Sequence, residues 1–454
     1  MLPSSPLATS SSKDVAPPVL GSSLRRELGR WDLTAIGVNQ VIGSAVFALP
    51  GSLAASAGAW SPWLVGAVGL ASMLIALSFA EVSSRFDATG GPYLYTRAAF
   101  GRFPAFQVGW LLWFTRAASW ASVISVLVMS LGFYFPVVTS GWSRAALITG
   151  VIGVIALINI RGIKQSSVVV NAFTIGKLAP LAIFVLVGLF YIDPGALAVG
   201  GAPRFTDLAA TALLLIFAYG GYEVVPVPAG EARDPRTAVP FALVMTVAIV
   251  MVVMVLVQTV AVGTYPDLGS SMTPLADASV LFMGAAGAAM ITAGAVVSTT
   301  GNNMGQALSG SRNLFALAEQ GDLPAMFGWI HPVFRTPVVA ILVTSGVALG
   351  LALSGTFVVL ATASAISRLV VYVATCASTL RLRSPRFEGR VKPATFVVPF
   401  GPVIPMAAIA ISLTILAGAT SAQLTGGVLA IAAGTVLYWV AIRGRARAIE
   451  GESQ

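Results

Sequence analysis

The chain contains a single cysteine, Cys376, and a single histidine, His331, in 454 residues. It can therefore form neither an internal disulfide nor a Cys/His metal cluster, so metal chemistry, thiol redox chemistry and a bound cofactor are not expected. Charge is also scarce, because only 9% of the residues are charged, against roughly 25% in an ordinary soluble domain. Hydrophobic residues make up 57% of the chain. This composition predicts a polytopic membrane protein.

Three further signals are missing from the sequence. Residues 1–30 are rich in Ser and Pro and lack the apolar core and cleavage site of a secretory signal, which predicts a disordered cytoplasmic tail. No GxxxxGK[ST] loop occurs, so nucleotide hydrolysis is not an expected energy source. The net charge of +9 is spread over short loops instead of being gathered in one soluble module, so nucleic acid is not an expected partner.

The apolar runs predict an all-α membrane protein with twelve transmembrane helices, since a spanning helix needs about 20 largely apolar residues. The predicted spans are 32–56, 61–84, 103–135, 144–160, 168–192, 207–230, 238–263, 276–310, 337–354, 356–380, 395–419 and 423–442. Residues 31–442 would then form one transmembrane domain between an N-terminal tail, 1–30, and a C-terminal tail, 443–454. The longest polar connections, 84–102, 311–336 and 381–394, are too short for an independent core.

The distribution of positive charge predicts the orientation of these spans. Of the 26 Lys and Arg residues, the predicted outer segments contain only Arg144 and Arg204, and the spans contain Arg116, Lys177 and Arg368. All the others lie on the side that carries both termini. Because positive loop residues stay inside, both termini are predicted to be cytoplasmic and the protein to lie in the plasma (inner) membrane.

Two of the predicted spans are interrupted. The first breaks its apolar run at Gly43, and the sixth breaks at Gly220-Gly221 and again at Pro226 and Pro228. Small residues in a membrane helix commonly allow close helix packing. However, two breaks at the first helix of each group of five predict a 5+5 inverted repeat, with helices 11 and 12 as additions, and a binding site at the breaks.

Helix ends at these breaks have a clear chemical use. Unwinding at Gly43-Ser44-Ala45 would free backbone N–H groups at the positive end of a half helix, where a carboxylate can bind. Unwinding between Phe217 and Gly221 would free carbonyl oxygens that can accept hydrogen bonds from an ammonium group. The two breaks together would hold the backbone of an amino acid.

Four stretches carry a resemblance to a known family. They are "GVNQVIGSAVFALPG", "SFAEVSSRFDATGGPYLYTRAAFG", "FAYGGYEVVPVPAGEARDPRTAVP" and "SGSRNLFALAEQGDLPAMF", in that order over about residues 30–340. Together they resemble the amino acid, polyamine and organocation permease superfamily, whose members share the leucine-transporter fold. The last two predicted helices add little to the resemblance.

The resemblance implies a carboxylate site on the first interrupted helix. It assigns the substrate carboxylate to the unwound motif at Ile42, Gly43, Ser44 and Ala45. Family members usually have Gly at the third position of the motif, where this chain has Ala45. The extra methyl group would narrow the pocket or restrain the unwinding.

The resemblance also implies roles for the sixth helix. Phe217 matches the aromatic residue that covers the substrate, and the carbonyls of Phe217, Ala218 and Tyr219, before Gly220, match the acceptors for its amine. Glu223 matches an acidic position that senses protons in some relatives. The residue types alone leave two roles open for Glu223, a proton carrier or the counter-ion of a buried arginine.

Lys177 resembles a family lysine whose ammonium group occupies the place of a sodium ion in sodium-coupled relatives. It would link its helix to the backbone of the first helix and to the eighth, where Ser298 is the matching hydroxyl. Sodium coupling is therefore not expected. The alternative is a lysine whose ammonium group reaches the membrane surface, but Lys177 lies far from both ends of its span.

The cations in the predicted spans outnumber the acids at mid-membrane. Lys177, Arg116 and Arg368 face a single acid, Glu223, and a charge inside a membrane is by default a functional hypothesis. Arg116 would either bind an acidic group of the substrate or pair with Glu223 or with backbone carbonyls. Both possibilities remain open from the sequence.

The sequence thus predicts a secondary transporter of amino acids, independent of sodium, that works by alternating access with proton symport or exchange. A polyamine or other organocation is the alternative substrate, and a non-transporting sensor or a channel is a remote alternative. An enzyme is not expected, because no catalytic constellation is visible. The predicted partners are a small-molecule substrate and the lipid bilayer, and the oligomeric state is not predicted.

Overall fold

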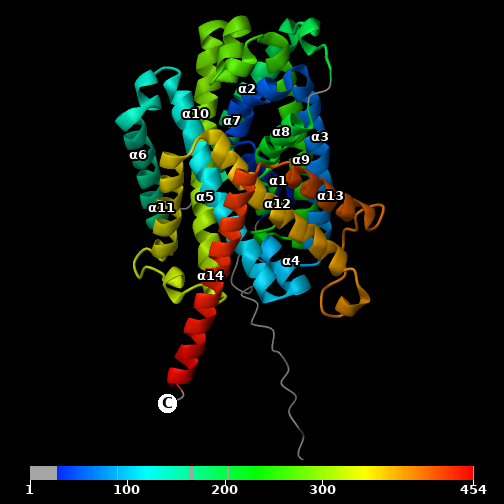
Figure 1. The fold of residues 1–454 in the computed structure, drawn as a ribbon, viewed down its shortest axis with the longest axis vertical. Coiled ribbons are helices and arrows are strands. Elements are labelled where there is room, and N and C mark those ends of the chain that lie inside the picture. The colour runs from blue at the N-terminus through cyan, green and yellow to red at the C-terminus, as the bar shows by residue number, and fades with distance from the viewer. Residues whose placement is uncertain (1–27, 89, 163–166, 202–203, 453–454) are drawn as a thin grey trace, which may run out of the picture.

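The computed structural model describes residues 28–88, 90–162, 167–201 and 204–452. Within these residues the secondary structure is helical, apart from one isolated bridge between Leu28 and Ala232. Nine helical stretches of this described part are long and apolar enough to cross a membrane, and two further apolar helices are shorter. Figure 1 shows these helices as one bundle, with α2 toward one end and α4 at the other.

The first half of the chain forms seven helices, α1 (Arg30–Val41), α2 (Ala45–Ala57), α3 (Ser61–Ser83), α4 (Gly91–Phe100), α5 (Arg102–Gly132), α6 (Gly141–Ile160) and α7 (Ser167–Gly188). The second half forms α8 (Phe205–Tyr219), α9 (Pro235–Thr264), α10 (Pro274–Glu319), α11 (Val338–Ser354), α12 (Phe357–Arg381), α13 (Val403–Ala417) and α14 (Ser421–Glu452). Short 3₁₀ turns connect them, at Gly58–Trp60, Pro136–Thr139, Leu189–Tyr191, Pro194–Leu197, Tyr222–Val224, Ala229–Glu231, Leu268–Ser270, Ala325–Gly328 and Pro385–Phe387.

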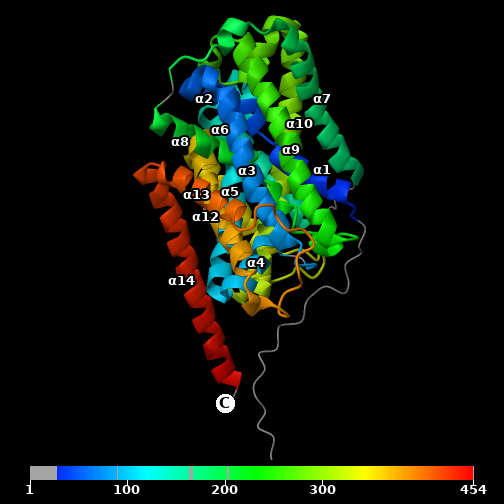
Figure 2. The same cartoon turned by 90° about the vertical axis from the view of Figure 1, so that its right-hand side faces the viewer.

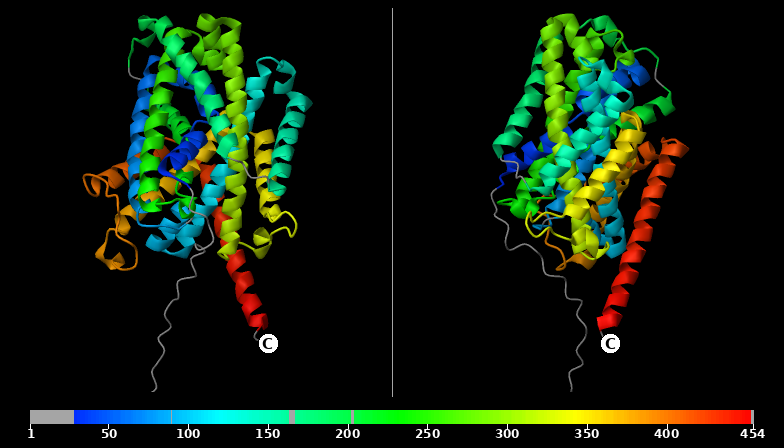
Figure 3. Two further views of the ribbon diagram at one scale, coloured as in Figure 1. Left: turned by 180° about the vertical axis from the view of Figure 1, so that it is seen from behind. Right: turned by 90° about the vertical axis from the view of Figure 1, so that its left-hand side faces the viewer.

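Helix α5 lies at the centre of the bundle. It packs against α10, α12, α11 and α14, and 94% of its apolar stretch is buried, against 22% for α14. Helices α6 and α11 lie side by side at one edge, away from α13 (Figures 1 and 3). Helix α14 runs along the outside and extends past the end that carries α4 (Figure 2). Side chains on α5 therefore reach the middle of the bundle.

The chain leaves helical geometry at the two predicted breaks. Helix α1 ends at Val41 and α2 begins at Ala45, and Ile42 between them has φ −74° and ψ 84°, outside the helical region. Helix α8 ends at Tyr219, and Gly221 has φ +134°, a conformation that favours glycine. Each break lies within an apolar segment, so its polar backbone groups need partners inside the bundle.

Helix boundaries differ from the prediction where polar residues continue a helix. Helix α4 lies in the predicted connection 84–102, α10 continues past residue 310 to Glu319, and α14 continues through the predicted tail to Glu452. Helix α13 begins only at Val403. Hydropathy marks the end of an apolar run, whereas a helix continues as long as its hydrogen bonds and packing allow, which explains these differences. Most of the predicted N-terminal tail lies outside the described residues.

The N-terminal segment is attached to the link between α8 and α9. The backbone N–H of Leu28 donates to the Glu231 carbonyl at 3.0 Å, and the N–H of Arg233 donates to the Leu28 carbonyl at 3.0 Å. Residues 28–30, predicted as tail, therefore belong to the folded part. This contact joins the start of one interrupted segment to the chain that follows the other.

At the end of α3, Glu81 joins three parts of the chain. Its fully buried carboxylate accepts hydrogen bonds from the Arg383 Nε at 2.7 Å and Nη2 at 2.5 Å, and from the Val398 N–H at 2.9 Å. The Arg85 guanidinium lies farther away, at 3.8 Å. Glu81 thus holds the connection between α12 and α13 against α3.

We expect Glu81→Ala to lower the free energy of unfolding by about 2 kcal/mol or more, because it leaves a partly buried guanidinium and a backbone N–H without their acceptor. Thermal or denaturant unfolding of the purified protein in detergent measures the change. The control is Lys392→Ala, which breaks an exposed ion pair with Asp87 and should change the free energy by less than about 0.5 kcal/mol. Equal effects of the two substitutions would contradict the prediction.

Candidate functional site

A cavity of about 260 Å³ lies between the two interrupted segments. Its lining comes from the first break, from α5, from the end of α8, from α10 and from α12, namely Gln40, Val41, Gly43, Ser44, Ala45, Ser119, Val123, Phe217, Gly220, Asn302, Gln306 and Arg368. Among these lining residues the only charged side chain is Arg368. The cavity is therefore a small polar space with a positive group on its wall.

Side chains of α7 and α10 hold the carbonyls at the end of α1. The buried ammonium group of Lys177 donates to the carbonyls of Asn39 and Ile42, each at 2.9 Å. The Ser298 hydroxyl donates to the Gly43 carbonyl at 2.8 Å. These contacts satisfy the orphan carbonyls at the end of α1, which would otherwise be unpaired inside an apolar bundle.

Two amide side chains of α10 complete this arrangement. The Asn302 Nδ2 donates to the Gln40 carbonyl at 3.0 Å, and the Gln306 Nε2 donates to the Asn302 Oδ1 at 3.3 Å. Gly43 lets Asn302 approach, because a Cβ on Gly43 would lie 2.9 Å from its side-chain carbonyl carbon. The first break is therefore built around a glycine and a polar stripe on α10.

Ser44 and Ala45, at the beginning of α2, line the cavity. The first N–H groups of a helix have no partner within that helix and carry partial positive charge. Ser44, directly before α2, is buried, and its hydroxyl has no hydrogen-bond partner. The first turn of α2 contains no acidic residue. This helix end can bind an anion through the Ser44 hydroxyl and the N–H groups of Ser44, Ala45 and Val46, whereas the Gly43 and Phe47 N–H groups already donate to carbonyls of the chain.

The end of α8 lies across the cavity from this point. The Phe217 carbonyl accepts from the Gly220 N–H at 3.1 Å and from the Arg368 Nη1 at 3.3 Å. A Cβ on Gly220 would overlap the Arg368 guanidinium, so glycine makes this approach possible. The Tyr219 hydroxyl instead donates to the Val65 carbonyl at 2.8 Å, on α3.

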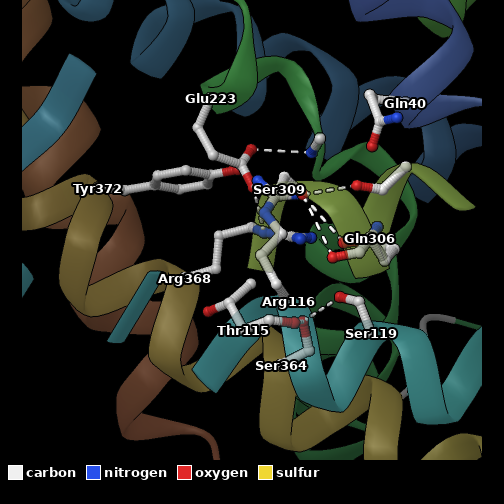
Figure 4. Close-up of polar contacts among 12 residues, drawn as sticks. Gln40, Thr115, Arg116, Ser119, Glu223, Gln306, Ser309, Ser364, Arg368 and Tyr372 are labelled. Carbon is white, nitrogen blue, oxygen red and sulfur yellow. Dashed lines mark hydrogen bonds and ion pairs between the residues drawn. The ribbon is translucent and has the colours of Figure 1, made fainter. Parts of the chain in front are cut away.

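A buried ion-pair network centres on Glu223 (Figure 4). Its Oε1 accepts from the Arg116 Nη2 at 2.8 Å and lies 3.0 Å from the Arg368 Nε. Its Oε2 accepts from the Gly221 N–H at 2.8 Å and from the Tyr372 hydroxyl at 3.1 Å. One carboxylate thus serves two guanidinium groups, which leaves the network with one positive charge more than negative charge.

Of the nine predicted substrate-binding residues, five line the cavity and four do not. Gly43, Ser44, Ala45, Phe217 and Gly220 line the cavity. Lys177 and Ser298 hold the first break from behind, and Ile42, Ala218 and Tyr219 belong to the two segments without being among the lining residues. Arg116 pairs with Glu223 and does not line the cavity, whereas Arg368 does both.

Sequence reasoning missed the contributions of α10 and α5. Asn302 and Gln306 lie four residues apart within an apolar helix, so they share one helix face, and this spacing was a readable signal. Ser119 also lines the cavity and forms a hydrogen bond with the Ser364 hydroxyl at 2.7 Å. No pattern in the sequence distinguishes Ser119 from the other small polar residues of α5.

A second cavity, of about 310 Å³, lies farther along α2 and α5, on the side away from α4. Its lining is mostly apolar and includes Phe47, Met129, Met272 and Ile291. The Glu223 network lies on the other side of the first cavity, because Arg116 precedes Ser119 on α5 and Tyr372 follows Arg368 toward the α4 end of α12. An apolar space and an ion-pair network therefore flank the polar cavity.

Across the described residues, no group of three or more His, Cys, Asp or Glu side chains is arranged to hold a metal ion. The chemistry that the site offers is hydrogen bonding and charge, supplied by helix ends, hydroxyls, amides and one guanidinium. Such a set of groups can bind and orient a small polar molecule.

The chain is similar to known membrane transporters along most of its length. The family model of the amino acid permeases matches residues 28–442. The chain is 28% identical to the methylthioribose transporter of Bacillus subtilis (strain 168), over 92% of this chain and 94% of that protein. It is 30% identical to the serine/threonine exchanger SteT (87% and 91%) and 28% identical to the branched-chain amino acid permease BcaP (70% and 72%) of the same organism.

We expect Gly221→Ala to destabilise the protein by about 2 kcal/mol, because alanine disfavours φ +134° and its Cβ would lie 2.8 Å from the Gln40 carbonyl oxygen. Gly346→Ala on α11, where a Cβ meets open space, is the matched control and should be neutral or stabilising by up to about 1 kcal/mol. Thermal unfolding in detergent compares the two. Equal stability of both variants would show that the second break tolerates a side chain.

Proposed function

Because the chain belongs to the amino acid permease family, and is thus a multi-pass membrane transporter of amino acids or related substrates, we propose that it is a secondary transporter that works by alternating access without sodium. The observation that carries this proposal is the polar cavity between the two interrupted segments, in the middle of otherwise apolar spans. In transporters, interrupted helices that meet at mid-membrane mark the binding site.

We further propose the topology that alternating access requires. The twelve spans are α1 with α2, α3, α5, α6, α7, α8 with the chain after it, α9, α10, α11, α12, α13 and α14. The first five spans and the next five form two inverted repeats, and this is supported by an interruption in the first span of each group. Both termini lie in the cytoplasm and the protein lies in the plasma membrane, as the charge distribution favours.

The proposed transport cycle uses the groups on the two sides of the cavity. A substrate carboxylate binds the N–H groups at the beginning of α2, beside the unpaired Ser44 hydroxyl. The apolar second cavity is the outer approach, and the Glu223 network closes the path toward the α4 end. Release on that side requires the network to part, so the ion pairs act as the inner closure.

Independence from sodium rests on Lys177. Its ammonium group donates to the carbonyl oxygens of Asn39 and Ile42, next to the Ser298 hydroxyl. It thus supplies the positive charge that a cation bound by these oxygens would otherwise supply. A sodium ion at the same oxygens would meet a fixed like charge at contact distance. Lys177 therefore holds these carbonyls in place as a bound sodium ion would, so no sodium ion is needed there.

Glu223 fits the role of a counter-ion better than that of a proton carrier. If Glu223 took up a proton, Arg116 and Arg368 would be left as two buried cations without an anion, which is costly in a membrane. The other buried acids of the described part, Glu81 and Asp322, are also ion-paired. We therefore propose substrate exchange in preference to proton symport.

Polyamines and other organocations are poor candidates for this cavity. The single charged side chain of its lining is the Arg368 guanidinium, and Lys177 adds a second positive charge behind the first break. A dication would be repelled by both groups. A substrate with a carboxylate is favoured.

We expect counterflow in proteoliposomes loaded with a panel of amino acids and small carboxylates. At least one labelled compound of the panel should enter faster when its unlabelled form is inside, because a carrier returns only with substrate in an exchange cycle. An imposed pH gradient should change the exchange rate little. Uptake that accumulates only with an inward proton gradient would contradict exchange, and no counterflow with any compound would contradict transport.

We expect the same counterflow rate in sodium chloride and in choline chloride, because Lys177 fills the cation position. Lys177→Met should lower exchange by about tenfold or more, since the Asn39 and Ile42 carbonyls lose their buried donor. Lys392→Met, at an exposed lysine, is the matched control and should retain the wild-type rate. A requirement for sodium in the wild-type protein would contradict this role of Lys177.

A further inference from the structure

Three helix ends meet at the cavity, and the protein supplies a charged partner to only two of them. The carbonyl end of α1 carries partial negative charge and is contacted by Lys177. The carbonyl end of α8 is also negative and is contacted by Arg368 through Phe217. The N–H end of α2 is positive, and the described lining residues around it include no acid. The remaining electrostatic requirement of the cavity is therefore an anion.

Arg368 occupies the position where an amine would be bound. The Phe217 carbonyl, which the family resemblance assigned to a substrate ammonium group, already accepts from the Arg368 Nη1. Gly220 leaves the space that the guanidinium fills. An ammonium group brought to the same carbonyl would meet a fixed cation within a few ångströms.

The charge of the network strengthens this effect. Glu223 neutralises one guanidinium, while both Arg116 and Arg368 contact it, and Arg368 is the one of the two that reaches the cavity. The uncompensated positive charge is thus presented to the ligand by Arg368. A buried guanidinium gains most from an anion or from a neutral hydrogen-bond acceptor.

We propose that Arg368 determines specificity by replacing the ammonium group of the substrate, so that the site selects small carboxylates that carry a neutral oxygen group in place of an amine. A 2-hydroxy acid fits this description, because its carboxylate binds α2 and its hydroxyl oxygen accepts from Arg368 without repulsion. The inference rests on the proposed function, since it takes the carboxylate site at α2 as its starting point.

Matched pairs of compounds test this proposal with the purified full-length protein in detergent. L-lactate is compared with L-alanine, and L-glycerate with L-serine, by the concentration that gives half of the maximal thermal stabilisation. We expect each hydroxy acid to act at a concentration about tenfold lower than its amino acid. Counterflow of the same compounds in proteoliposomes should give the same order.

Arg368→Gln removes the cation from the cavity and leaves Arg116 and Glu223 as a one-to-one ion pair. It should reverse the preference toward the amino acid. Arg116→Gln is the comparison variant, because it removes one guanidinium from the same carboxylate but outside the cavity lining. The hydroxy acid should stay preferred in this variant, by a smaller factor than in the wild type, because Glu223 then pairs with Arg368 alone. Gel filtration establishes that both variants are folded.

The outcomes separate the inference from the function on which it rests. A wild-type protein that prefers the amino acid of each pair overturns the role of Arg368 and leaves the transporter proposal intact. The same reversal in Arg116→Gln as in Arg368→Gln also overturns that role. If neither compound of any pair stabilises the protein or exchanges, the carboxylate site itself is wrong and the inference falls with it. The wild-type measurement decides even where a variant does not fold.

Discussion

The structure depends on one physical constraint, which is that a helix cannot stop inside an apolar bundle unless its last carbonyls find donors. Helix α1 stops at Val41, and Lys177, Ser298 and Asn302 supply those donors from α7 and α10. These three side chains stabilise the interruption by donating hydrogen bonds to its carbonyls, and the cavity lies at this interruption. Without them the first break would leave backbone carbonyls unpaired inside the bundle.

The same reasoning explains the second interruption and its charges. The end of α8 is held by a guanidinium, and that guanidinium is balanced in turn by Glu223, Arg116 and Tyr372. Each buried charge therefore serves backbone geometry and electrostatics together. Because the network is shared by α5, α8, α12 and the turn after α8, a movement of one of these elements disturbs the ion pairs of the others.

Much of this arrangement could be predicted from the sequence, and the reasons are local. Gly43 and Gly220 predict the positions of the two breaks. The resemblance to a family predicts that Lys177 and Ser298 both lie at the first break. The choice between Arg116 and Arg368 could not be predicted, because it depends on which side of a helix faces the cavity and on the angle at which α12 crosses α5. Helix α4 and the continuation of α14 were missed because neither is apolar enough to appear as a span.

The short bridge between Leu28 and Ala232 has a mechanical consequence. It fastens the chain before α1 to the chain that follows the second break, by two backbone hydrogen bonds. A displacement of either segment relative to the other would break these hydrogen bonds. The bridge therefore favours displacement of the two segments together over displacement of one of them alone.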